Sequence, residues 1–298
     1  MKETTRKDHS ARILQVLLYV QTHLDEALDL EALARKAYYS PYHFHRIFSS
    51  LVGESLKEHI RRLRLERAAL QLIRTDRPVT SIAFQAGYET HEAFTRAFKR
   101  HFELAPKPYR EENRLPAMPP TPSGVHFDPD RNLTGFQVQR IGRPMEVRVE
   151  HLPEREVAFV RHTGPYSEVS GAWQKLMAWL ASKGVIFHLQ GTLAVVYDDP
   201  TITASEHIRY DACALLAQVP EGEGEFGRQT IAAGRYAIGT HVGPYEELGQ
   251  SYSWLSGPWL LESGEMPADR PPLEVYLNDP RMTPPEKLRT EIHFALED

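Results

Sequence analysis

The sequence has one cysteine in 298 residues, so disulfides are excluded and any metal site would depend on histidine and carboxylate ligands. That cysteine, Cys213, lies in the apolar run YDACALLAQV, which indicates a small buried side chain rather than a reactive thiol. No apolar run approaches the roughly 18 residues of a membrane helix, and the first residues are too polar for a secretion signal. We therefore expect a cytoplasmic globular protein with no membrane partner.

Common catalytic and cofactor signatures are also missing. The sequence has no Ser-His-Asp order, no glycine-rich phosphate loop and no cluster of metal ligands. His43 and His45 lie two residues apart in an expected helix, a spacing that points their side chains in different directions. The sequence therefore predicts no metal and no cofactor.

The charge is distributed unevenly along the chain. Residues 1–114 hold 20 Lys and Arg against 15 Asp and Glu, whereas the remainder holds 15 basic and 25 acidic residues. The net charges are therefore +5 and −10. A polyanionic partner such as nucleic acid suits the first part and not the second.

A change of composition separates these two parts. The stretch 111–135 contains five prolines and no periodic apolar pattern, which predicts a linker, placed at 113–140. Before it, apolar residues recur with helical spacing; after it, alternating strand patterns surround two helical stretches. We therefore expect two domains, an all-α domain at 8–112 and an α+β domain at 141–298.

Each part is also an internal repeat. In the first, Ala34, Ala37 and Tyr39 match Ala83, Ala86 and Tyr88 at a separation of 49 residues. In the second, RHTGPY at 161–166 matches THVGPY at 240–245, and LAVVYDDP at 193–200 matches LEVYLNDP at 273–280. Repeats of this length indicate duplicated structural modules.

The repeated unit of the first part has the pattern of a helix-turn-helix. In the first copy Ser40 and Pro41 form a helix start, and Phe44 and Phe48 belong to an apolar stripe. The opposite face is expected to point outward; it holds Tyr42, His43, His45, Arg46 and Ser49. In the second copy Gly87 suits a turn with positive φ. The corresponding outward face holds His91, Glu92, Thr95, Arg96 and Lys99.

A long helix is predicted between the two copies, from the sequence GESLKEHIRRLRLERAALQLI. Its outer face is expected to carry Arg61, Arg62, Arg64 and Arg67. A rigid spacer of this kind would hold two recognition helices on one face of DNA.

At these residues the sequence resembles the AraC/XylS family of bacterial transcription factors, over about 10–110. The resemblance implies a double-stranded DNA operator as partner, with RNA polymerase as a further partner that a regulator could contact. By position it implies base contacts from Tyr42, His45, Arg46, His91, Glu92, Thr95 and Arg96, and phosphate contacts from Arg62 and Lys99. A solvated helix face is the alternative for each of these residues.

The second part is rich in large amphipathic rings, more than two small modules usually need for their cores. Such rings between related modules suit a flat or cationic organic molecule. One acid stands out: in the repeat Glu274 replaces Ala194, and Tyr276 replaces Val196. A buried lone carboxylate is costly unless it is paired, hydrogen-bonded or protonated, so a fold seldom keeps one for packing.

This part resembles the GyrI-like effector-binding domain, over about 145–297. The resemblance is carried by FVRHTGPYSEV, GTHVGPYEEL and LEVYLNDPRMTPPEKLRTEIHFAL. It implies a small-molecule effector, of the class of lipophilic cations sensed by multidrug regulators, in a site between the two modules. The residues expected to bind it are Glu274, Tyr276, Tyr166, Tyr245, Trp173, Tyr252 and Trp254.

Three alternatives stay open at this point. Glu274 could form a salt bridge with Arg289 or face solvent, instead of a ligand. The second part could be a hydrolase of reactive small molecules, with Glu274 as base or nucleophile and Tyr276 or Tyr245 as proton donor. The chain could also be an architectural DNA binder whose second part binds protein through a flat surface.

Overall fold

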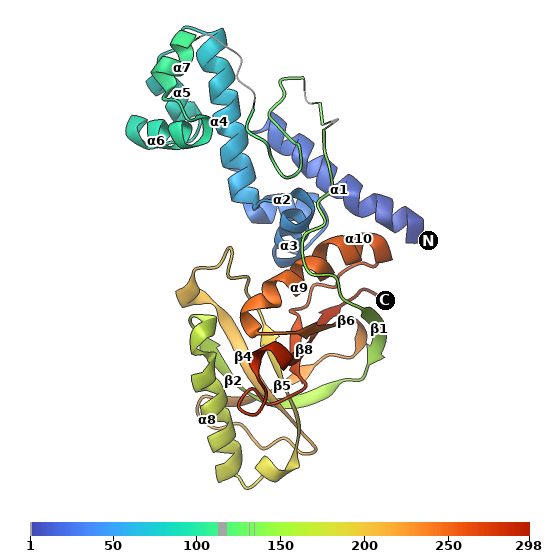
Figure 1. Cartoon of the computed structure of the whole chain (residues 1–298). Coiled ribbons are helices and arrows are strands. Elements are labelled where there is room, and N and C mark those ends of the chain that lie inside the picture. Colours follow the sequence, from blue (N-terminus) through green and yellow to red (C-terminus); the bar gives the residue numbers. More distant parts are fainter. Residues whose placement is uncertain (1, 113–117, 131, 134) are drawn as a thin grey trace. The chain divides into compact units, whose positions relative to one another are not determined.

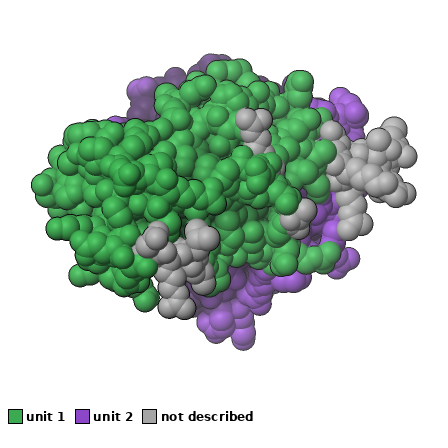
Figure 2. Space-filling view, turned by 90° about the horizontal axis from the view of Figure 1, so that it is seen from above, with its two compact units in different colours: residues 1, 3–141 green, residues 2, 142–298 purple. Residues whose placement is uncertain are grey.

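The computed structural model describes residues 2–112, 118–130, 132–133 and 135–298, and the chain forms two compact units (Figures 1 and 2). The first comprises Glu3–Ile141 and the second Gly142–Asp298. Within the described residues no helix is long and apolar enough to cross a membrane.

The first unit is helical, as expected. Its helices are α1 (Lys2–Thr22), α2 (Leu30–Lys36), α3 (Pro41–Val52), α4 (Leu56–Arg74), α5 (Val79–Gln85), α6 (His91–Phe102) and α7 (Pro106–Glu112). In Figure 1, α4 runs from the α2–α3 pair to the α5–α6 pair. The structure thus confirms two helix-turn-helix elements joined by one long helix.

The two helix-turn-helix elements use the same local devices. The turn before α3 places Tyr38 at φ 58°, and the equivalent turn before α6 places Gly87 at φ 81°. The side chains of Ser40 and Thr90 then accept hydrogen bonds from the third residue of each recognition helix, which satisfies a free backbone N–H. The apolar stripes are buried, with Phe44 and Phe94 fully inaccessible.

The predicted linker is bound to the helical unit instead of being free. Residues 113–117, 131 and 134 of the prediction lie outside the described residues. The described residues of 118–141, here called the strap, form hydrogen bonds with α1, α3 and α4. Prolines disfavour a helix or a central strand in this segment. Its remaining backbone N–H groups can still donate hydrogen bonds to neighbouring helices.

The second unit is an eight-stranded antiparallel sheet with helices. The strands are β1 (Val147–Leu152), β2 (Arg155–Thr163), β3 (Leu189–Val196), β4 (Arg209–Leu216), β5 (Phe226–Ile231), β6 (Gly234–Val242), β7 (Leu273–Tyr276) and β8 (Arg289–Ala295), in the order β1-β6-β8-β7-β3-β4-β2-β5. The longer helices are α8 (Val169–Ser182) and α9 (Leu248–Trp254), the latter continued by a π-helical stretch and α10 (Leu260–Ser263).

The duplication is visible in the topology. One module is β2-α8-β3-β4 and the other is β6-α9-β7-β8, and they join where β3 pairs with β7. Both Gly-Pro-Tyr turns have the same conformation, since Gly164 and Gly243 adopt φ 144° and 142°. In each copy the preceding histidine, His162 or His241, places Nε2 3.1 Å from the carbonyl oxygen of the turn proline.

Helices α8 and α9 cover the same face of the sheet. Ala194 belongs to the core under α8, and Ile292 belongs to the core under α9. Both are cross-strand partners of Glu274, and paired residues point to the same face. The opposite face holds a second apolar core that includes Cys213, whose thiol is buried as expected. Burial also raises the pKa of this thiol, so it is unreactive.

Candidate functional site

Glu274 is a buried carboxylate with two phenol donors. It lies on β7 beneath the two helices and is 8% exposed. The Tyr252 hydroxyl, from α9, donates to Oε1 at 3.0 Å, and the Tyr276 hydroxyl donates to Oε2 at 2.8 Å. Each bond favours the charged form of the carboxylate, which offsets part of its desolvation.

A chain of hydrogen bonds continues from Tyr276 into the first module. The Trp173 indole N–H donates to the Tyr210 hydroxyl oxygen at 3.0 Å. The hydroxyl oxygens of Tyr210 and Tyr276 lie 2.7 Å apart. Because the Tyr276 hydroxyl uses its one O–H to donate to Glu274, the Tyr210 hydroxyl must be the donor in this bond. The donors therefore run in one direction, from Trp173 to the Glu274 carboxylate, and bonds aligned in this way strengthen one another.

Aromatic rings surround these hydroxyl groups. The rings of Trp173 and Tyr245 each meet the Tyr276 ring edge-on, with centroids 5.7 Å apart. The Tyr166 ring meets the Tyr210 ring in the same way at 6.0 Å. We call the seven residues the Glu274 cluster: Glu274, Tyr276, Tyr252, Tyr210, Trp173, Tyr245 and Tyr166.

The phenols of Tyr276, Tyr210 and Tyr245 remain protonated. Burial, and then the charge of Glu274, raise the pKa of Tyr276 well above its ordinary value. The same two causes raise the pKa of Tyr210 and Tyr245. These hydroxyl groups are therefore hydrogen-bond donors throughout the physiological pH range and are weak acids. Weak acidity disfavours the hydrolytic alternative, which needs Tyr276 or Tyr245 to release a proton.

The structure brings together six of the seven predicted ligand residues. Trp254 is the exception: within the described residues it forms no hydrogen bond or ring contact with the cluster. Tyr210 was missing from the predicted set. Among the described residues the alternative salt bridge with Glu274 is not observed, and Arg289 is exposed at the start of β8.

The cluster occupies equivalent positions of the two modules. The equivalent pairs are Tyr166 and Tyr245, Trp173 and Tyr252, Ala194 and Glu274, Val196 and Tyr276, and Tyr210 and Thr290. The aromatic pairs are shared by both copies, whereas the acid is present in one copy only. One buried charge is thus enclosed by two sets of rings.

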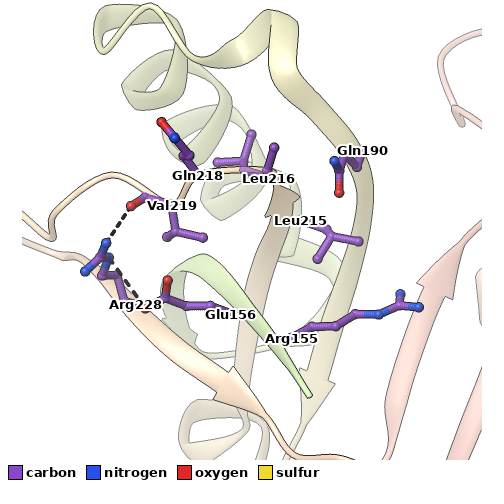
Figure 3. A pocket seen from close by; sticks show the side chains of 9 residues that line it. Arg155, Glu156, Gln190, Leu215, Leu216, Gln218, Val219 and Arg228 are labelled. Carbon is purple, nitrogen blue, oxygen red and sulfur yellow. Dashed lines mark hydrogen bonds and ion pairs between the residues drawn. The ribbon is translucent and has the colours of Figure 1, made fainter. Parts of the chain in front are cut away.

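A cavity of about 820 Å³ lies elsewhere, in the first module (Figure 3). It is lined by residues at the opposite ends of β3 and β4 from the cluster, including Gln190 and Leu215. Its Arg228 guanidinium donates to the Val219 carbonyl at 2.7 Å and lies 3.7 Å from Glu156, so its charge is already engaged. The predicted ligand residues do not line this cavity. Among the described residues, moreover, no group of His, Cys, Asp and Glu could hold a metal ion.

The outward face of α6 agrees with the sequence prediction. Glu92, Arg96 and Lys99 are exposed, and His91 and Thr95 are partly exposed. The helix also carries Arg100 on its exposed side. A row of cationic side chains on an exposed recognition helix can contact phosphates and base edges.

On α3 the residues predicted to contact DNA differ in exposure, and their role as DNA contacts stays a prediction. His45 and Arg46 are buried, at 2% and 9% exposure, and His43 is buried as well. The Arg46 guanidinium lies over the Tyr42 ring, 5.0 Å from its centroid. Of the predicted outward face, Tyr42 and Ser49 remain partly exposed.

Arg62, predicted as a phosphate contact on the outer face of α4, lies inside the helical unit in the structure. Arg62 is 8% exposed and lies between two acids, Glu54 and Glu66. Its Nη1 donates to Glu66 at 2.8 Å, and its Nε and Nη2 donate to Glu54. Arg64 and Arg67 are engaged too, with backbone carbonyls of Leu24 and Gln85 respectively. The guanidinium groups of Arg62, Arg64 and Arg67 therefore stabilise the helical unit.

Family models match both units. A GyrI-like small molecule binding domain matches residues 145–297, and a helix-turn-helix domain matches residues 33–112. Regulatory protein SoxS of Salmonella typhimurium is 36% identical over 100 residues, which cover 33% of this chain and 94% of SoxS. The chain belongs to the AraC/XylS family. Its second unit is the GyrI-like domain of this family member.

This chain is also similar to the transcriptional regulator Rob of Salmonella typhimurium. The two are 35% identical over 133 residues, which cover 44% of this chain and 46% of Rob. The match thus spans about half the length of this relative. Among solved structures, the crystal structure of the EcmrR C-terminal domain aligns with 52% of this chain and 98% of that chain, at 20% identity and a TM-score of 0.42.

Proposed function

We propose that this AraC/XylS-family chain is a cytoplasmic DNA-binding transcription regulator, and that a lipophilic organic cation bound at the Glu274 cluster modulates its activity. Double-stranded operator DNA and the small-molecule effector are the proposed partners. The buried carboxylate of Glu274 is the observation that supports the effector class most directly.

The chemistry of the cluster favours a cation. The Tyr252 and Tyr276 hydroxyl groups stabilise a negative charge on Glu274. A cation bound beside this carboxylate would be attracted strongly, because the site is shielded from water. Trp173, Tyr166 and Tyr245 are partly exposed. Aromatic faces attract organic cations and also bury their apolar groups. An anion would be repelled by the same carboxylate.

Calorimetry with tetraphenylphosphonium tests the effector class. We expect binding to the wild-type chain and a large loss of affinity in Glu274→Gln, which keeps the shape and removes the charge. Glu286→Gln is the matched control, because it removes an exposed acid from the same module. Equal affinity of wild type and Glu274→Gln for this cation would contradict the proposed site.

The DNA-binding part of the proposal is supported by the exposed face of α6. Base contacts are proposed for His91, Glu92, Thr95 and Arg96, and a phosphate contact for Lys99. In α3 the partly exposed Tyr42 is the proposed contact. Selection of duplexes from a random-sequence pool by the wild-type protein tests this activity. Failure to enrich any sequence would contradict specific DNA recognition.

A further inference from the structure

The strap contacts the end of the recognition helix α3. The backbone N–H of Gln139 donates to the carbonyl of Leu51 at 2.9 Å. That carbonyl is among the last four of α3, which have no partner within the helix. The next residue but one, Gly53, has φ 86°, and a Cβ added there would lie 2.4 Å from Cβ of Pro122. The C-terminus of α3 is therefore built to fit closely against the strap.

Further anchors hold the strap on α1 and α4. Glu66 of α4 is fully buried, and its Oε2 accepts the backbone N–H of Phe127 at 2.7 Å. Its Oε1 lies 3.1 Å from His126 Nδ1. From α1, the Gln21 side chain donates to the His126 carbonyl at 2.7 Å and accepts the Asp128 N–H at 3.1 Å. Because a buried carboxylate serves as an acceptor for the strap, this segment is an integral part of the helical unit.

The chain then enters the second unit directly at α9. The Arg143 N–H donates to the Gln250 carbonyl at 3.2 Å. Gly142 has φ 107°, and a Cβ added there would lie 2.4 Å from the Trp254 backbone N and 2.5 Å from the Gln250 carbonyl oxygen. Only glycine fits this approach. Between these two contact points, α9 carries Tyr252, whose hydroxyl donates to Glu274.

We infer that the segment Gln139–Arg143 is the route by which occupancy of the Glu274 cluster alters the recognition helix α3. One end of this five-residue segment is bonded to the same helix that supplies a donor to Glu274, and the other end satisfies a carbonyl of α3. A displacement of α9 caused by a ligand would be carried through four peptide bonds to the C-terminus of α3. The inference rests on the proposed function, because it requires that a ligand binds at the Glu274 cluster.

Gly142→Ala tests the route, with Gly249→Ala as the matched control. Gly249 lies on α9 itself, and a Cβ added there meets nothing within 4 Å. The measurement is the affinity for the selected duplex with and without tetraphenylphosphonium. Allosteric coupling is typically about 5- to 150-fold. We expect wild type and Gly249→Ala to show a change of this size and Gly142→Ala to show less than about a two-fold change.

The outcomes separate the route from the function. If Gly142→Ala keeps the change seen in Gly249→Ala, the route is wrong and the proposed function stands. If the cation binds wild type without altering duplex affinity, the proposed regulation fails and the route fails with it. If the cation does not bind wild type, the proposed effector class fails first.

A second pair of variants keeps the test valid if Gly142→Ala does not fold. Gln139→Pro removes the N–H that bonds to Leu51, whereas Gln139→Ala keeps it and removes only the side chain. We expect coupling to be lost in the proline variant and retained in the alanine variant. Amide hydrogen exchange without any cation gives an independent readout: exchange at Gln139 should be faster in Gly142→Ala than in Gly249→Ala. Unchanged exchange would overturn the route.

Discussion

Ala194 and Glu274 occupy the same position in the two modules, and they face each other across β3 and β7. Their neighbours are paired symmetrically, Leu193 with Val275 and Val195 with Leu273. The site where the two modules meet therefore lies on the axis that relates them. Two identical modules would place two carboxylates, or none, at this point. Divergence of one copy allows a single buried charge there.

Ala194→Glu is expected to destabilise the second unit strongly. Side chains directly opposite on paired strands have Cβ atoms about 4.5–5.5 Å apart, so two buried carboxylates would repel each other. Ala194→Gln introduces the same volume without the charge and is the control. The difference between the two variants in unfolding free energy should reach several kcal/mol at pH 7, on the order given for a buried ion. All four tryptophans lie in this unit, so tryptophan fluorescence in urea measures it.

Tyr276→Phe is expected to weaken cation binding and to lower stability. The substitution removes the donor to Glu274 and the acceptor for Tyr210, so two buried polar groups lose a partner at a cost of about 1–3 kcal/mol. Tyr197→Phe is the matched control, because the Tyr197 hydroxyl donates to the buried Asp211 at 2.9 Å. The control should lose similar stability while its affinity for tetraphenylphosphonium stays at the wild-type value. Equal affinities of the two variants would contradict the role of Tyr276.

The duplication explains why much of the second unit could be predicted from the sequence. Matching turns, strands and helices locate both modules, and the comparison of copies identifies Glu274 and Tyr276 as departures from the shared scaffold. Tyr210 also differs from its equivalent, Thr290, but this difference does not indicate that its hydroxyl lies beside that of Tyr276. Its role depends on a hydroxyl-to-hydroxyl distance between strands β4 and β7, which no local pattern encodes.

The first unit shows a different limit. Helical periodicity predicted helices α2 to α6. It assigned Arg62 to the outer face of α4, because periodicity within one helix does not account for an acid outside that helix. Glu54 lies eight residues earlier, before the helix begins, and its contact with Arg62 depends on the path of the chain into α4. The strap was missed for a related reason: most of its anchors are backbone groups, such as the N–H of Phe127, which every non-proline residue has.

Arg62→Ala is expected to destabilise the helical unit far more than Arg61→Ala. Removing Arg62 leaves Glu66 and Glu54 without their shared cation, which typically costs about 3–5 kcal/mol for a buried pair. Arg61 is exposed on the same helix, and its removal should change stability by less than about 0.5 kcal/mol. Urea unfolding followed by far-ultraviolet circular dichroism measures the difference. A comparable loss in both variants would contradict the structural role of Arg62.

Glu54 should make the helical unit sensitive to acid. Burial alone would raise its pKa, but hydrogen bonds from His59 and Arg62 outweigh burial and lower it from 4.5 to about 2. A carboxyl whose pKa is lower in the folded state stabilises the fold above its unfolded pKa, and this contribution is lost as pH falls. The window is therefore between about pH 4.5 and 2, and the loss is at most about 3.4 kcal/mol. Glu54→Gln should flatten this dependence, whereas Glu89→Gln, at an exposed acid, should keep it.

Arg96→Ala and Lys99→Ala should weaken DNA binding in different ways. Both side chains are exposed on α6, but Arg96 is the proposed base contact and Lys99 the proposed phosphate contact. Loss of a base contact costs about 1–3 kcal/mol and relaxes specificity at one position, whereas loss of a phosphate contact weakens binding to all sequences and reduces the salt slope by about one. Binding of the selected duplex and its single-base variants across a salt series separates these effects. Identical specificity profiles for wild type and Arg96→Ala would rule out base reading by Arg96. Arg281→Ala is the control, because Arg281 is an exposed arginine of the second unit, paired with Asp279.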